Sequence, residues 1–166
     1  MIIKEIKNRR SVRDYKPDDV PEEYVIEIIK AGQFAPTARH NKAVEFIVVK
    51  DQKTKENIFE ITGQEFVKEA PILIIPVTDG NKTICPVQDL SVASENMFLQ
   101  ATSLGLGTVW KNLKIELNEE SKIKKMLGIP EQYRTINLIP VGFPSEKPQP
   151  HNENDFDSKK IHEEKW

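Results

Sequence analysis

The most extended helical periodicity along the chain lies between residues 87 and 104. Apolar side chains recur there at steps of three or four positions, namely Val87, Leu90, Ala93, Met97, Ala101 and Leu104. This spacing places them on one face of an α-helix. Gly105 follows, as a residue able to take the left-handed conformation that ends helices. Because Phe98 and Leu99 widen the apolar face, we expect a central core helix or one shared with a partner subunit.

Short apolar runs between the helical patterns predict strands. Residues 45–50 and 135–141 are rich in β-branched side chains, and residues 107–111 form a shorter candidate. Residues 71–78 are the most apolar run, which Pro76 interrupts. Because proline has no N–H to donate to a neighbouring strand, we expect this strand at a sheet edge or at a bulge.

Shorter helices are indicated by the residues at their ends. Pro21 is expected in the first turn of one helix, which Gly32 would end in the left-handed conformation. Asp51 and Asn118 are the expected N-caps of two others, because their side chains can accept hydrogen bonds from free backbone N–H groups. The expected ends of these two helices are the glycines that follow their apolar stripes, Gly63 and Gly128.

Helical and strand patterns alternate over most of the chain, but the strands are few. We therefore expect an α+β fold in which a small mixed or antiparallel central sheet is flanked by helices. A short helix marked by Ile3 and Ile6 would begin the chain. From about residue 144 onward, prolines punctuate a polar segment. We expect a single domain over residues 1–166 whose extended carboxy-terminal tail lies on that domain or on a neighbouring chain.

Composition and charge exclude several classes of protein. The chain has 166 residues with a formal net charge of −2, and 38% of its residues are hydrophobic. This balance supports a packed core and excludes a disordered or collagen-like chain. A near-neutral charge is atypical of dedicated nucleic-acid-binding proteins, and no apolar run approaches the ~20 residues that span a bilayer.

Cysteine and histidine indicate neither a disulfide nor a metal site. Cys85 is the single cysteine, and we interpret it as a small buried apolar residue rather than a redox centre. The histidines, His40, His151 and His162, lie far apart with no metal-ligand spacing. Residues 1–5 lack the long apolar segment of a secretory signal. We therefore expect a cytoplasmic protein.

The densest cluster of charged side chains is RRSVR at residues 9–13. Arg9, Arg10 and Arg13 offer guanidinium groups whose paired N–H donors match phosphate oxygens, and Ser11 adds a hydroxyl. Two interpretations stay open, a phosphate site and a solvated basic turn. Nucleic acid is disfavoured as the anion because no aromatic residue interleaves with the arginines.

Two further segments combine small residues with polar side chains. In APTARHNK at residues 35–42, small residues and proline let a flat ligand approach the backbone beside His40, Asn41 and Lys42. An ordinary polar loop is the alternative. The second segment is GLGTVWKN at residues 105–112, where a helix ends and a strand begins. Because the strand follows the glycines, this is not the GxGxxG dinucleotide-binding fingerprint.

Five motifs occur in an order and at spacings that resemble a known family. They are RRSVRDY at residues 9–15, APTA at 35–38, GLGTVW at 105–110, LGIP at 127–130 and IPVGFP at 139–144. With them, residues 2 to about 150 resemble the nitroreductase-like FMN-dependent flavoproteins. The resemblance implies a homodimer with FMN bound where the two subunits meet.

The resemblance also assigns residues to parts of the cofactor. Those implied to hold the FMN phosphate are Arg9, Arg10, Ser11 and Arg13. Those implied to lie against the isoalloxazine ring, from the other subunit, are Pro36, Thr37 and Ala38. The candidates for its pyrimidine edge are His40, Asn41 and Lys42, and the choice between His40 and Asn41 stays open. The strand through Trp110 and Lys111 is implied to pass near the flavin N5.

For activity, the resemblance implies hydride uptake from NAD(P)H and delivery of electrons to nitroaromatics or quinones by a ping-pong route. The flavin carries out such chemistry while the protein supplies binding, orientation and electrostatics. No catalytic acid, base or nucleophile is therefore required of the sequence. A cation near the N1–C2 edge of the flavin, Arg13 or Lys42, would stabilise the anionic reduced ring and raise its potential.

Departures from the family pattern define the alternative hypotheses. Val44 replaces a tryptophan, residues 111–113 replace Ile-Gly-Gly, and the acidic tail supplies no arginine to the phosphate. A second hypothesis is therefore a flavin-binding protein on the same fold that stores, senses or delivers flavin without turnover. A third is an anion-binding dimer without flavin.

Overall fold

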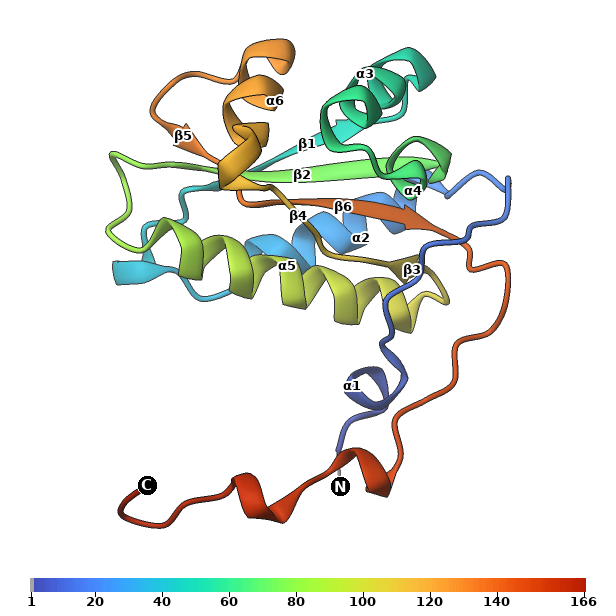
Figure 1. The fold of residues 1–166 in the computed structure, drawn as a ribbon, viewed down its shortest axis with the longest axis vertical. Coiled ribbons are helices and arrows are strands. Elements are labelled where there is room, and N and C mark those ends of the chain that lie inside the picture. The colour runs from blue at the N-terminus through green and yellow to red at the C-terminus, as the bar shows by residue number, and fades with distance from the viewer. Residues whose placement is uncertain (1) are drawn as a thin grey trace.

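An antiparallel sheet between two layers of helices makes up the fold of the computed structural model, which describes residues 2–166 (Figure 1). The strands are β1 (Val44–Val49), β2 (Ile72–Asp79), β3 (Gly107–Thr108), β4 (Lys111–Asn112), β5 (Tyr133–Arg134) and β6 (Asn137–Gly142). Four of them follow the order β1-β2-β6-β3, while β4 pairs with β6 and β5 pairs with β2. All these pairings are antiparallel, so the predicted α+β fold with a small antiparallel sheet is confirmed.

The helices cover both faces of the sheet (Figure 1). Those on one face are α2 (Glu22–Gln33) and α5 (Pro86–Ser103). Those on the other face are α3 (Gln52–Thr62), α4 (Glu65–Glu69) and α6 (Glu119–Leu127). The predicted long helix and its end are confirmed, because Gly105 follows α5 with φ 77°. The short helix α1 (Lys4–Asn8) lies beside α5.

β2 is buried on both of its faces, which explains its nearly uninterrupted apolar sequence. Ile72 and Ile74 pack with residues of α2 and α5. Leu73, Ile75 and Val77 pack with residues of α3 and α6 on the opposite face. Each of these five side chains is at most 4% exposed, so β2 joins the two halves of the core.

Of the two alternatives expected from Pro76, the sheet edge is wrong, whereas an irregularity of the ladder is present, since Ile74 pairs with Ile139 and Thr78 with Arg134, four residues against five. β2 lies between β1 on one side and β6 and β5 on the other. Its pairing with β6 covers Ile72–Ile74, and its pairing with β5 begins at Thr78. Pro76 falls in the interval between these two pairings, where a ladder N–H is not needed on that side of the strand.

The signals at the helix ends are confirmed in part. Asp51 accepts a hydrogen bond from the Thr54 N–H at 2.8 Å, which makes it the N-cap of α3. Gly63 and Gly128 end their helices in the left-handed conformation, with φ of 64° and 68°. Asn118 precedes α6, but its side chain makes no capping hydrogen bond and its own backbone is left-handed with φ 52°. The expected capping role of Asn118 is therefore wrong.

Gly32 lies inside α2 rather than at a left-handed helix end, so that expectation is also wrong. The helix continues to Gln33. A Cβ at position 32 would stand 2.8 Å from Phe46 Cζ and 3.0 Å from Met97 Cγ. The glycine is thus needed for the close approach of α2 to β1 and α5, not for a turn.

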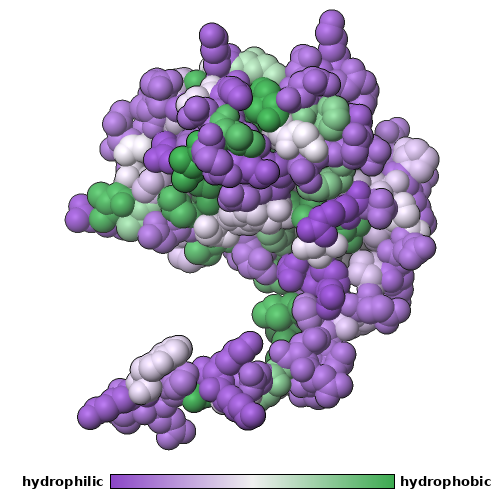
Figure 2. Space-filling model, viewed as in Figure 1, coloured by the Kyte–Doolittle hydropathy of each residue, from purple (hydrophilic) through white to green (hydrophobic). Residues whose placement is uncertain are grey.

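The carboxy-terminal segment leaves the domain after β6 and runs past α1 (Figure 1). Its secondary structure consists of two short 3₁₀ turns, η3 (Glu153–Asp155) and η4 (Ser158–Lys160). The His151 N–H donates to the Lys7 carbonyl at 2.8 Å, which fastens the segment to α1. Figure 2 shows the outer part projecting from the body of the molecule, and Ile161 there is 61% exposed.

Candidate functional site

Arg10 and the loop over residues 36–42 lie in separate regions near the two ends of α5. Arg10 lines a cavity with Gly105 and Gly107, which follow the carboxy-terminal end of the helix. At the other end, Asp89 in the first turn accepts a hydrogen bond from the Ala38 N–H. Because α5 has 18 residues, its ends lie about 27 Å apart at 1.5 Å per residue. One chain therefore does not bring the two regions together.

Backbone pairing fixes the amino-terminal segment against β3. Ser11 forms a parallel β-bridge with Thr108, and the Val12 N–H donates to the Thr108 carbonyl at 2.9 Å. Gly107 permits this approach, since a Cβ there would stand 2.6 Å from the Val12 Cβ. The Tyr15 hydroxyl donates to the Val12 carbonyl at 2.7 Å, and burial raises the pKa of that phenol. Sequence reasoning missed Tyr15 as an anchor, although it directly follows the arginine cluster.

The extended backbone divides the arginine cluster between neighbouring cavities. Arg10 lines a cavity of about 470 Å³ together with Lys16. Ser11 and Arg13 line an adjacent cavity of about 510 Å³. Successive side chains of an extended segment point to opposite sides, which explains the division. The other charged residues on the rim of the second cavity are Asp14, Glu146 and Lys147.

Long or partly exposed contacts hold the three guanidinium groups. These contacts are Arg9 Nε with Glu95 Oε1 at 3.8 Å, Arg10 Nη1 with His151 Nδ1 at 3.3 Å, and Arg13 Cζ with the Phe66 ring centroid at 5.9 Å. Contacts of this kind contribute little to folding stability. The guanidinium groups are therefore free to rearrange around an anion.

The second region is the loop between α2 and β1, which contains the 3₁₀ turn η1 (Ala38–His40). Its backbone is left-handed at three non-glycine residues, Arg39, His40 and Lys42, with φ of 55°, 54° and 51°. The Lys42 N–H donates to Thr37 Oγ1 at 3.1 Å. A cavity of about 660 Å³ opens beside the loop, and the predicted residues that line it are Pro36, Thr37, His40 and Lys42.

Asn41 differs from its neighbours because its side chain turns into the protein. Its Nδ2 donates to the Ala38 carbonyl at 2.8 Å and to Asp89 Oδ2 at 3.2 Å. Its Oδ1 accepts from the Ala43 N–H at 2.8 Å. Asn41 is thus absent from the lining of the cavity that His40 borders. Sequence reasoning missed Asp89, whose signal is an acidic residue directly beside the apolar stripe of the long helix.

The predicted strand over residues 107–111 is split into β3 and β4, and its two candidate residues separate. Trp110 packs edge-on against Phe98, with ring centroids 6.3 Å apart, and lines a cavity of about 450 Å³. The Lys111 side chain is 6% exposed, and its Nζ lies 2.8 Å from Glu119 Oε2. The Lys111 ammonium is therefore occupied inside the protein, which leaves the backbone of this residue for any contact with a ligand.

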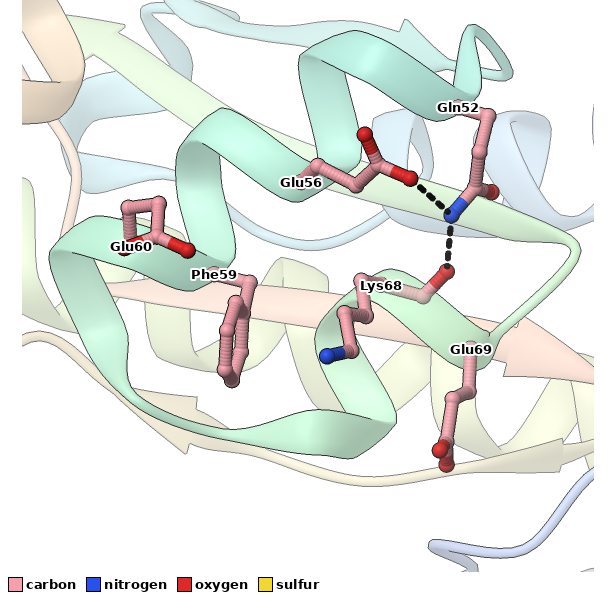
Figure 3. A pocket seen from close by; sticks show the side chains of 6 residues that line it. All are labelled: Gln52, Glu56, Phe59, Glu60, Lys68 and Glu69. Carbon is pink, nitrogen blue, oxygen red and sulfur yellow. Dashed lines mark hydrogen bonds between the residues drawn. The ribbon is translucent and has the colours of Figure 1, made fainter.

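A further cavity of about 520 Å³ lies between α3 and α4, and none of the predicted residues lines it (Figure 3). Lys68 places its Nζ 3.8 Å from the centroid of the Phe59 ring and 2.6 Å from Glu65 Oε2. The other lining side chains are Gln52, Glu56, Glu60 and Glu69. The single positive charge of this cavity, on Lys68, is thus outweighed by the carboxylates around it.

Neither a metal-ligand cluster nor a membrane-spanning helix occurs among residues 2–166. Within residues 2–166, no group of three or more His, Cys, Asp or Glu side chains is placed to hold a metal ion. Over the same described range, no helix has the length and apolar character needed to cross a bilayer. Cys85, expected to be buried, is a half-buried free thiol at the start of α5.

The chain matches the model of the nitroreductase family over residues 6–68 and 62–143. It belongs to that family. A Methanothermobacter thermautotrophicus protein with the provisional name NADH dehydrogenase/NAD(P)H nitroreductase is 37% identical over 169 residues, covering 99% of this chain and 87% of its own length. An FMN-dependent nitroreductase of Clostridium difficile R20291 has a structure with a TM-score of 0.93 and 31% identity, covering 99% of this chain and 100% of that one.

A more distant relative is the Bacillus subtilis protein named FMN reductase (NAD(P)H). It is 25% identical, covering 88% of this chain and 67% of its own length. Together these comparisons confirm the family that the five motifs predicted. They also confirm the nitroreductase-like fold, since the C. difficile structure superposes on nearly the whole chain.

Proposed function

We propose that this nitroreductase-family protein is a homodimeric NAD(P)H oxidoreductase that uses FMN to reduce nitroaromatic or quinone acceptors by a ping-pong route. The family match and the names of its relatives support an FMN-dependent NAD(P)H oxidoreductase. The homodimer, the acceptors and the kinetic order go beyond those comparisons. The observation that carries the dimeric site is the separation of the two binding regions along α5.

The amino-terminal segment suits an FMN phosphate. Alternation along its extended backbone separates Ser11 and Arg13, which line one cavity, from Arg10, which lines the other, while Arg9 contacts Glu95 of α5. The Arg13 guanidinium group and the Ser11 hydroxyl in one cavity form a donor set matched to a phosphate dianion. We therefore assign the phosphate to Ser11 and Arg13, with Arg9 and Arg10 adding positive charge from neighbouring positions.

Two chains are needed to complete the site. The cavity beside Ser11 and Arg13 and the cavity beside the 36–42 loop share no lining residue. Exposed apolar side chains near the second cavity and along α5 supply a surface for association, because exposed apolar groups of this size are typical of interfaces. The side chains concerned are Phe34, Val87 and Val92, with exposed fractions of 81%, 48% and 38%.

The residues of this chain would bind and orient the cofactor, and the cofactor would carry out the reaction. Bound FMN supplies hydride transfer between NAD(P)H and the acceptor. Pro36 and Thr37 of the partner subunit would border the ring, and Lys42 would bring positive charge to its pyrimidine edge. Trp110, which lines a separate cavity with Val87 and Ser91, would lie toward the N5 side of the flavin. These assignments require no proton-transferring side chain.

Spectra and kinetics test the proposal. We expect the purified protein to be yellow, to sediment at about twice 19.1 kDa, and to oxidise NADH or NADPH when menadione or a nitroaromatic is present. A yellow protein that does not oxidise either nucleotide is the non-catalytic flavin-binding alternative. A colourless protein whose added FMN keeps the spectrum of free flavin contradicts both.

Mixed dimers test the shared site directly. One chain carries Ser11→Ala and Arg13→Ala, the other carries His40→Ala and Lys42→Ala, and the two carry different affinity tags. Each homodimer has two impaired sites, whereas the mixed dimer has one site in which both halves are wild type. We expect the mixed dimer to bind one tight FMN. A site built within one chain would leave the mixed dimer as impaired as its parents.

A further inference from the structure

Asp89 is a buried acidic residue whose carboxylate is occupied by hydrogen bonds. It lies in the first turn of α5 and is 3% exposed. Oδ1 accepts from the Ala38 N–H at 2.8 Å. Oδ2 accepts from Asn41 Nδ2 at 3.2 Å and from Thr83 Oγ1 at 2.6 Å. Such donors, together with the positive end of the helix dipole, compensate the desolvation of a buried carboxylate.

Two of these donors belong to the loop whose backbone is left-handed at Arg39, His40 and Lys42. L-residues disfavour that conformation, so a loop that holds three of them needs contacts that fix it. Ala38 and Asn41, the two residues that Asp89 binds, flank Arg39 and His40. The carboxylate therefore holds both ends of the strained turn.

The orientation of the loop side chains follows from this attachment. Both N–H donors of the Asn41 amide are used, one on the Ala38 carbonyl and one on Asp89. Its carbonyl oxygen accepts from the Ala43 N–H. His40 and Lys42, in contrast, line the cavity beside the loop. Of the two residues that the sequence leaves as alternatives, His40 is therefore the one that the geometry favours for a ligand in this cavity.

We propose that Asp89 is a positioning residue for the flavin-binding loop, and that it turns Asn41 inward so that His40 meets the pyrimidine edge of the flavin. This inference deepens the proposed function and rests on it. The pyrimidine edge presents carbonyl acceptors on either side of an N–H donor. A neutral imidazole has one donor and one acceptor nitrogen, so His40 can pair with either kind of group.

FMN titrations of the dimeric protein test the inference. The wild-type titration comes first. If the wild-type protein does not bind FMN, the proposed function is contradicted, and the inference about Asp89, which rests on it, falls as well. We expect His40→Ala to raise the FMN Kd on the order of tenfold, the factor for losing one hydrogen bond of about 1.4 kcal/mol. His40→Gln, which keeps a donor and an acceptor, is expected to recover most of the affinity.

A double-mutant cycle separates positioning from a general loss of stability. Asp89→Asn replaces one acceptor oxygen with an NH₂ donor, so one loop contact must break. We expect it to raise the Kd about as much as His40→Ala does, and to add little in the His40→Ala background. Should Asp89→Asn not fold, Asn41→Ala breaks the same attachment and takes its place in the cycle.

The flavin absorption spectrum provides a second readout. We expect His40→Ala and Asp89→Asn to shift the visible bands of bound FMN in the same direction, because both remove the same contact at the ring. Asp51→Asn is the matched control, since it removes an Asp that also accepts from a backbone N–H and a threonine hydroxyl but lies at the start of α3. The inference is overturned if the effects of Asp89→Asn and His40→Ala on the Kd are additive. It is also overturned if His40→Ala keeps the wild-type affinity and the wild-type flavin spectrum.

Discussion

Lys111 Nζ and Glu119 Oε2 lie 2.8 Å apart in an ion pair that is almost excluded from solvent, with the two side chains 6% and 0% exposed. Glu119 Oε2 also accepts from the Lys114 N–H at 2.9 Å. Lys111 Nζ donates in addition to the Asn112 carbonyl at 2.6 Å. The pair thus joins β4 to the start of α6, directly beside Trp110.

Lys111→Met is expected to lower the free energy of unfolding by about 3–5 kcal/mol, because it leaves the Glu119 carboxylate buried without its counter-charge. Combining it with Glu119→Leu is expected to recover much of that loss, since two apolar side chains can replace a buried pair. Recovery stays incomplete because the Lys114 N–H loses its acceptor. Urea unfolding measures all three stabilities.

The exposed pair of Lys30 and Glu27, whose side chains are 51% and 47% exposed, provides the control. Lys30→Ala is expected to change stability far less than Lys111→Met, because solvent screens exposed pairs. Equal losses in the two variants would show that the interior pair is not what holds β4 to α6.

The two sides of the arginine segment predict different affinities for FMN. Arg13→Ala is expected to weaken binding by about 1.5–3 kcal/mol, the range for hydrogen bonds to charged groups. Arg10→Ala is expected to have a smaller effect, because Arg10 lines the other cavity. Fluorescence titration of the apoprotein with FMN measures both. A larger loss in Arg10→Ala would reverse the assignment of the phosphate face.

Lys42 and Arg13 are expected to differ in their effect on the flavin potential. Lys42 lines the loop cavity beside His40, whereas Arg13 lines the cavity assigned to the phosphate. A cation stabilises the anionic reduced ring only when it lies near the N1–C2 edge. Lys42→Ala is therefore expected to lower the midpoint potential, and Arg13→Ala to leave it near the wild-type value. Spectroelectrochemical titration distinguishes the two.

Gly107→Ala is expected to reduce stability and FMN affinity together. The added Cβ would stand 2.6 Å from the Val12 Cβ, so the segment that carries Ser11 and Arg13 must move away from β3. Overpacking of this kind costs about 1–3 kcal/mol. Gly105→Ala is the comparison, because its Cβ meets nothing within 4 Å and its cost is backbone strain at φ 77°. Thermal unfolding and FMN titration of both variants check this, and equal FMN affinities would contradict it.

The Asp51 cap predicts a dependence of stability on pH. Hydrogen bonds from the Thr54 hydroxyl and N–H lower the pKa of the Asp51 carboxyl. A lowered pKa in the folded state contributes stability above the ordinary value of about 3.9, and that contribution is lost as pH falls through the folded value. Asp51→Asn is therefore expected to lower the Tm at neutral pH and to approach the wild-type Tm in acid. A Tm difference that stays constant across this range would exclude the mechanism.

Features set by neighbouring residues in the chain were predictable from the sequence. The Asp51 cap needs only the free N–H groups of the turn that follows it, and Gly63 and Gly128 need only their own backbone freedom. The apolar stripe of α5 likewise lies within one helix. The five motifs then identified the family, which no single local feature does.

Features set by distant residues were not predictable. Pro76 suggested an edge strand, but β2 is central. The proline is tolerated there because the pairings of β2 with β6 and β5 leave a gap beside it, and the sequence of β2 does not reveal that gap. Gly32 suggested a helix end, whereas its role is to leave room for Phe46 and Met97. These two side chains approach it only in the folded protein, so the sequence did not show that role. The roles of Asn41 and Lys111 depend in the same way on the buried carboxylates of Asp89 and Glu119.

The antiparallel pairing of β2 with β6 has a consequence for synthesis of the chain. Ile72 pairs with Val141 and Ile74 pairs with Ile139. Over these residues, one side of the central strand β2 therefore stays unpaired until β6, the last strand of the sheet in chain order, has been made. Until β6 leaves the ribosome, this stretch of β2 has an open, apolar edge of the kind that recruits other nascent chains. The sheet therefore reaches its full set of strands only after β6 has been synthesised and has left the ribosome.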